Sequence, residues 1–101
     1  LISAGTTLMR GVKACRAAGA AQVDAFATHG VFEPESAQLL GTDGPDRLIV
    51  TDSILPTRIG GHDTARSPVV LPVSQLFAEA IRRICAGESV VALRELQPKR
   101  R

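Results

Sequence analysis

The spacing of hydrophobic residues predicts two long helices, one near each end of the chain. The first covers residues 6–18 and is followed by Gly19, and the second covers residues 75–86 between Ser74, as its cap, and Gly87. The residues that would form their buried stripes are Leu8, Val12 and Cys15 in the first helix, and Phe77, Ala80, Ile81 and Ile84 in the second. Each helix is therefore expected to pack one face against a core.

Three short apolar segments between these helices are typical of strands, at residues 23–28, 48–51 and 69–73. The middle one is continuously apolar and β-branched, as expected of a strand buried on both faces. Residues 34–40 predict a short helix with Pro34 in its first turn, and residues 55–68 predict a loop rich in proline and glycine. The alternation indicates an α/β fold, a parallel sheet with helices on both faces, which binds ligands beyond the carboxyl ends of its strands.

Composition narrows the class of protein. The 101 residues make one small domain or part of one, and 12 basic against 10 acidic residues leave a net charge of +2. That balance, with no Trp or Tyr, argues against nucleic-acid binding, and no apolar stretch approaches the ~20 residues of a membrane span. Cys15 and Cys85 are read as core residues of a reduced, cytoplasmic protein, and no Cys/His cluster has the spacing of a metal site.

The first eight residues are the main candidate for a binding site. Small and hydroxylic residues, among them Ser3, Thr6 and Thr7, run directly into the first helix, and Gly5 allows a ligand to approach the main chain. The unpaired N–H groups and the positive dipole end of that helix point to the same place, so the stretch can form a phosphate site. The alternative is an ordinary helix start with Ser3 or Thr6 as the N-cap.

Four stretches, in this order, resemble the C-terminal part of ribose-phosphate pyrophosphokinases, which have a type I phosphoribosyltransferase fold. They are residues 1–8, residues 27–32 (Ala-Thr-His-Gly-Val-Phe), residues 48–54, and residues 78–84 followed by residues 87–90. The loop at the start needs a strand before it, which the sequence does not contain. We therefore expect residues 1–101 to be the C-terminal portion of a phosphoribosyltransferase-like domain, an incomplete fragment completed by upstream residues.

The resemblance implies an activity for the full-length protein in nucleotide biosynthesis. The family transfers diphosphate from MgATP to ribose 5-phosphate, giving phosphoribosyl pyrophosphate and AMP. In this resemblance the 5-phosphate would be bound by Ser3, Ala4, Gly5, Thr6 and Thr7. The family site also contains a pair of carboxylates and a basic catalytic loop, and both would lie upstream of residue 1, with most ligands of ATP-bound Mg²⁺. The resemblance implies a homo-oligomeric, cytoplasmic enzyme whose partners are ATP and ribose 5-phosphate, while this fragment holds no catalytic residue and is expected to be inactive alone.

Two places depart from the family pattern. The family loop reads Asp-Thr-x-Gly-Thr, so Ser3 replaces an acid, Ala4 removes a hydroxyl, and Gly5 and Thr6 stand in swapped order. Ser89 matches a serine of the phosphate/ADP regulatory site and is a weak regulatory candidate. Val91 stands where regulated members carry a second serine. Two alternatives stay open. One is a phosphoribosyltransferase, because that class shares the phosphate loop, and the other is a non-catalytic, synthetase-associated regulatory subunit, which the altered loop keeps open.

The remaining candidates have plainer explanations. His29 follows the first predicted strand and can act as an acid or base, but a structural histidine is favoured because no acid partner is visible. His62 and Asp63 are interpreted as solvated loop residues, and Arg82 and Arg83 as surface or subunit contacts.

Overall fold

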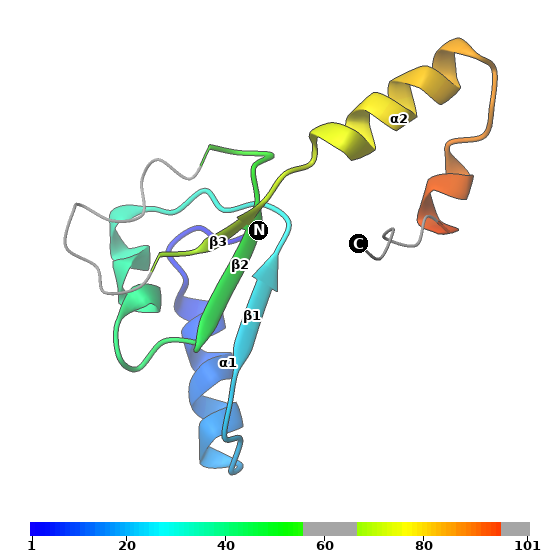
Figure 1. Cartoon of the computed structure of the whole chain (residues 1–101). Helices are drawn as coiled ribbons and strands as arrows, with labels where there is room; N and C mark the ends of the chain where they lie inside the picture. Colours follow the sequence, from blue (N-terminus) through cyan, green and yellow to red (C-terminus); the bar gives the residue numbers. More distant parts are fainter. Residues whose placement is uncertain (56–66, 96–101) are drawn as a thin grey trace.

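The computed structural model describes residues 1–55 and 67–95 and contains a small parallel sheet with helices. The elements in chain order are α1 (Thr6–Ala17), β1 (Asp24–Ala27), the 3₁₀ helix η1 (Pro34–Leu40), β2 (Arg47–Thr51), β3 (Val69–Leu71), α2 (Ser74–Cys85) and the 3₁₀ helix η2 (Val91–Glu95). The strands lie in the order β1-β2-β3, and both pairs are parallel (Figure 1). The predicted α/β class and strand order along the chain are confirmed, although most of the predicted loop at 55–68 lies outside the described residues.

The opening residues lie beside the chain that leaves β1. Ile2 forms a parallel bridge with Gly30, in which the Ile2 N–H donates to the His29 carbonyl at 2.9 Å and the Val31 N–H donates to the Ile2 carbonyl at 2.8 Å. Ile2 thus occupies a strand-like position next to the carboxyl end of β1. This pairing carries the loop that follows Ile2, and the start of α1, to the edge of the sheet where parallel folds bind ligands.

The hydrophobic core lies on one face of the sheet. Its buried residues come from the opening segment, α1, the loop after β1, η1 and the strands. They are Ile2, Met9, Ala25, Phe32, Leu39, Leu40, Leu48 and Val50. The other face carries Phe26, which is 72% exposed, and with Ile49 and Leu71 this residue lines a shallow hollow of about 240 Å³. In the described part of the chain helices pack on one face only, so the expectation of helices on both faces is wrong for residues 1–55 and 67–95.

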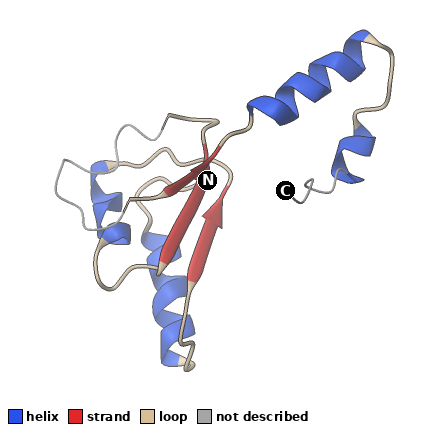
Figure 2. Cartoon of the chain, viewed as in Figure 1, coloured by secondary structure: helices blue, strands red, loops and turns tan. Residues whose placement is uncertain are grey.

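Helix α2 has the predicted bounds within a residue, but its predicted burial is wrong. The helix projects away from the sheet (Figure 2), and none of its residues is buried. Phe77 is 57% exposed and Ile84 is 67% exposed, although both belong to the predicted stripe. Cys15 and Cys85 are also exposed, which corrects their assignment to the core. No helix in the described ranges is long and apolar enough to cross a bilayer.

The predicted glycines at the ends of the two helices are confirmed, but the predicted cap at the start of α2 is wrong. Gly19 and Gly87 follow the two helices with φ values of 93° and 69°, the left-handed conformation that glycine adopts readily at a helix end. Ser74 is not the cap of α2, because Val73 occupies that position and no side chain caps the helix. The Val73 N–H instead donates to Oδ1 of Asp52 at 2.9 Å. A hydrogen bond to Asp52, the residue after β2, therefore holds the chain at the residue before α2.

Four charged side chains form a network at the end of α2. Arg82 donates to Glu79 at 2.9 Å and to Glu88 at 2.8 Å, and Arg83 donates to Glu79 at 2.8 Å and to the Ser89 carbonyl at 3.0 Å. Hydrogen bonds from Arg82, and then from Arg83, lower the pKa of Glu79 to about 2. The network ties the turn at residues 87–89 to the last turn of the helix.

We expect Glu79 to titrate near pH 2 instead of near its ordinary value of 4.5. Because the folded helix lowers the pKa of Glu79, the ionised carboxylate stabilises the helix fully above about pH 4.5. This stabilisation disappears as the pH falls through about 2. Carboxyl ¹³C NMR shifts would measure the titration, and amide shifts of α2 would report its helicity. The Glu79→Gln variant should lack the transition, whereas a Glu79 midpoint near pH 4.5 would contradict the network.

Candidate functional site

The loop at the start of α1 forms a concave surface at the carboxyl edge of the sheet. Residues 1–8 line a hollow of about 260 Å³. Gly5 is the N-cap of α1, with φ 83° and ψ 4°, and the first helical bond runs from the Met9 N–H to the Gly5 carbonyl at 2.9 Å. In the described part of the chain, the N–H groups of Thr6, Thr7 and Leu8 find no acceptor. Such unpaired N–H groups at a helix start are suited to an anion.

The structure decides against an ordinary capped helix. No side chain caps α1, so neither Ser3 nor Thr6 acts as the N-cap. The Ser3 hydroxyl instead donates to Oε1 of Glu33 at 2.6 Å. The predicted site residues Ser3, Ala4, Gly5, Thr6 and Thr7 do lie together around one hollow. With the Ser3 proton committed to Glu33, the donors left for an anion are main-chain N–H groups and the two threonine hydroxyls.

An unusual backbone conformation precedes Glu33. Phe32 is fully buried yet has φ 52°, the left-handed region that an aromatic residue rarely adopts. Its ring lies against Gly30, where an added Cβ would come within 2.4 Å of the ring. The Phe32 N–H donates to the Ile2 carbonyl at 3.3 Å, and the Glu33 N–H donates to the Ser3 carbonyl at 3.1 Å. This conformation turns the chain so that Glu33 lies against the loop.

A second polar group lies where β1 and β2 end. Nδ1 of His29 lies 2.7 Å from the Ser53 hydroxyl, which also lies 3.1 Å from the Thr28 carbonyl and 2.9 Å from the Thr51 hydroxyl. His29 therefore has a hydroxyl partner, and no acid partner in the described ranges. These contacts fit the structural interpretation of His29, because an imidazole poised as a base is usually oriented by a carboxylate.

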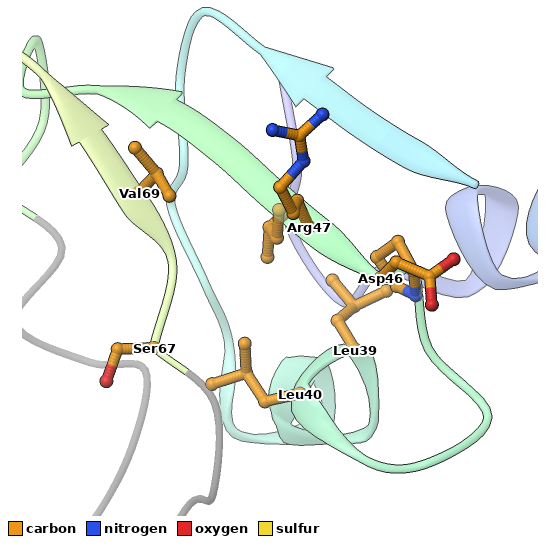
Figure 3. Close-up of a pocket in the computed structure, with 8 residues that line it drawn as sticks. Leu39, Leu40, Asp46, Arg47, Ser67 and Val69 are labelled. Atoms are coloured by element: carbon orange, nitrogen blue, oxygen red, sulfur yellow. The ribbon is translucent and has the colours of Figure 1, made fainter. Parts of the chain in front are cut away.

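Another hollow, of about 270 Å³, lies at the opposite edge, where β2 and β3 begin (Figure 3). Leu39, Leu40 and Val69 provide its apolar wall, and Arg47 is its cation. The guanidinium of Arg47 is paired with Asp24 of β1, and that hydrogen bond raises the pKa of Arg47 and lowers the pKa of Asp24. Since its cation is already paired and it lies at the amino edge of the sheet, this hollow is the weaker candidate for a ligand site.

The other predicted residues are not brought to the loop. Ser89 is exposed in the turn after α2, where its hydroxyl accepts the Val91 N–H at 3.3 Å, and Val91 is exposed at the start of η2. Arg82 and Arg83 are engaged in the ion-pair network of α2. His62 and Asp63 lie outside the described residues. Among residues 1–55 and 67–95, no three His, Cys, Asp or Glu side chains are grouped as metal ligands.

Two residues near the site were not singled out by sequence reasoning. Glu33 reaches Ser3 across 30 residues of chain, and Ser53 reaches His29 across 24. Ser53 is the second residue after the predicted strand at residues 48–51, a position that points to the ligand edge of a parallel sheet. Glu33 had a weaker signal, which is an acid placed between the Thr28–Phe32 stretch and Pro34.

Comparison with known proteins agrees with the resemblance. A family model described as "Phosphoribosyl synthetase-associated domain" matches residues 1–94. A ribose-phosphate pyrophosphokinase of Pasteurella multocida is 40% identical over 94 residues, which are 92% of this chain and 29% of that protein. Those of Haemophilus influenzae and Bradyrhizobium diazoefficiens are 39% and 36% identical, with the same coverage. The chain thus spans 29% of the length of these relatives, and its assignment to their C-terminal part stays a prediction.

Proposed function

Since the chain belongs to the phosphoribosyl synthetase-associated domain family, we propose that it is part of a ribose-phosphate pyrophosphokinase. The full protein would transfer diphosphate from ATP to ribose 5-phosphate, and its domain would have the type I phosphoribosyltransferase fold. The observation that carries this proposal is the match at 40% identity over 94 residues to an enzyme of that name. Cytoplasmic location, homo-oligomerisation and the use of Mg²⁺ with ATP belong to the same proposal.

The loop of residues 3–7 has the ribose 5-phosphate role in this proposal. A phosphomonoester dianion would accept from the N–H groups of Thr6, Thr7 and Leu8 and from the threonine hydroxyls, at the positive end of α1. Phosphoryl transfer also needs metal and cationic groups around the transferred phosphate. Residues 1–8 carry no ionisable side chain, so the loop would bind and orient the sugar phosphate but would not activate ATP.

A non-catalytic, synthetase-associated subunit is the second candidate. The observation in its favour is the altered loop, in which Ser3 and Ala4 replace two polar residues of the family pattern and Ser3 bonds to Glu33. The two candidate functions differ in whether the loop has to bind ribose 5-phosphate. An enzyme needs the loop to position ribose 5-phosphate for attack, whereas a subunit only needs the loop to fold.

Amide NMR shifts on titration with ribose 5-phosphate test the binding role. We expect Thr6, Thr7 and Leu8 to show the largest shifts, because their N–H groups are the free donors at the start of α1. The amides of α2, which lies away from the sheet, serve as an internal control. If ribose 5-phosphate perturbs another surface, or none, the binding role is wrong.

Activity is tested by moving the loop into an active relative. In the Pasteurella multocida enzyme, the segment that aligns with residues 3–7 would be replaced by Ser-Ala-Gly-Thr-Thr, and AMP formation from MgATP and ribose 5-phosphate would be followed. We expect retained activity with a raised KM for ribose 5-phosphate. A folded chimera without activity would favour the non-catalytic subunit. The 101-residue chain alone should form no AMP.

A further inference from the structure

Glu33 is held against the loop at several points. Its N–H donates to the Ser3 carbonyl at 3.1 Å, and its Oε1 accepts the Ser3 hydroxyl at 2.6 Å. Its own carbonyl accepts the Ser36 N–H at 2.9 Å and the Ser36 hydroxyl at 2.6 Å. The left-handed Phe32 before it adds a conformation that costs energy and persists only where the surrounding fold enforces it. The fold therefore fixes the main chain of Glu33 beside the loop, and the hydrogen bond to Ser3 holds its exposed carboxylate there.

Glu33 does not itself line the hollow, but its carboxylate bonds to Ser3, which does, so a negative charge lies beside the candidate anion site. Residues 1–8 contain no ionisable side chain, and Glu33 is the charged residue that bonds to them within the described ranges. A phosphate dianion in the hollow would be repelled by this charge. A hydroxyl next to the phosphate would instead donate to it, because an ionised carboxylate is a strong acceptor. Oε2 of Glu33 has no hydrogen-bond partner in the described part of the chain.

We propose that Glu33 is a specificity-determining residue of the loop and that it selects a phosphorylated sugar over a bare phosphate. The inference rests on the proposed function, because it takes the loop as the phosphate site. The phosphate is held by the start of α1, and Oε2 of Glu33 accepts a hydroxyl of the attached sugar. The same charge raises the cost of binding inorganic phosphate or any phosphomonoester without hydroxyls.

The test compares ribose 5-phosphate with methyl phosphate, a phosphomonoester without free hydroxyls. Calorimetry would give both affinities for the unmodified protein and for the Glu33→Gln, Glu33→Asp and Glu35→Gln variants. Glu35 is an exposed acid two residues further along and serves as the matched control for the loss of one negative charge. Thermal unfolding would check that each variant remains folded.

We expect the unmodified protein to prefer ribose 5-phosphate by about tenfold or more, the worth of one hydrogen bond to a charged group. Glu33→Gln should bind methyl phosphate about threefold tighter and lose most of that preference. Glu33→Asp should keep part of the preference, and Glu35→Gln should keep all of it. If Glu33→Gln binds both ligands with an unchanged preference, the role of Glu33 is refuted and the phosphate site stands. If the unmodified protein binds neither ligand at the loop, both proposals fail.

Discussion

Replacing Phe32 by alanine is expected to lower the free energy of unfolding by about 3–5 kcal/mol. The ring is fully buried in the core with Leu39 and Leu48, and it lies so close to Gly30 that the glycine has no room for a side chain. Truncation removes this ring from the buried core and leaves a cavity there. Because small domains are stable by only about 5–15 kcal/mol, the loss is a large part of the total.

Urea unfolding of matched variants checks the Phe32 prediction. Phe26→Ala removes the same side chain from an exposed position and should change stability by less than about 0.5 kcal/mol. Phe32→Gly should be less destabilising than Phe32→Ala by about 1 kcal/mol, since glycine adopts φ 52° without strain. An alanine variant as stable as the unmodified protein would show that the ring is not the centre of this core. Equal stability of the alanine and glycine variants would contradict the strained backbone.

The second large effect is expected at Gly5. Alanine there must adopt φ 83°, which costs about 1–2 kcal/mol, and its Cβ would lie 2.7 Å from Cδ1 of Leu39. Crowding a packed side chain costs about 1–3 kcal/mol more. Relief of the contact would shift the start of α1, where the free N–H groups of Thr6 and Thr7 lie. We therefore expect Gly5→Ala to lower stability by about 2–5 kcal/mol and affinity for ribose 5-phosphate by about tenfold or more.

Alanine substitutions at two other glycines serve as controls that separate the backbone strain at Gly5 from the crowding of Leu39. Gly19 has φ 93° but open space around it, so Gly19→Ala should show the backbone cost alone, about 1–2 kcal/mol, with unchanged ligand affinity. Gly11 lies inside α1 with ordinary helical dihedrals and open space, so Gly11→Ala should stabilise the protein by about 0.5–1 kcal/mol. If Gly5→Ala resembles Gly19→Ala in stability and leaves binding unchanged, the close packing of Gly5 on Leu39 does not position the site.

Much of the fold and the place of the candidate site could be predicted because both depend on short-range patterns. Helical spacing located α1 and α2 to within a residue or two, and the apolar run at Leu48–Val50 located the buried strand β2. Gly19 and Gly87 marked the helix ends because the turn there needs a positive φ. The order of helices and strands was enough to expect a parallel sheet and a site at its carboxyl edge.

Only the tertiary structure decided the contacts between residues that lie far apart in the chain. Periodicity shows that α2 has an apolar side, but not what packs against it, and in the described chain that side is exposed, with Cys85. The Ser3–Glu33 bond needs both the Ile2–Gly30 pairing and the left-handed turn at Phe32. Neither of these two features can be recognised in the local sequence, because a strand pairing and a rare backbone angle arise from packing of the whole domain. The sequence by itself therefore determined the loop and its helix, and the fold decided which side chain stands beside them.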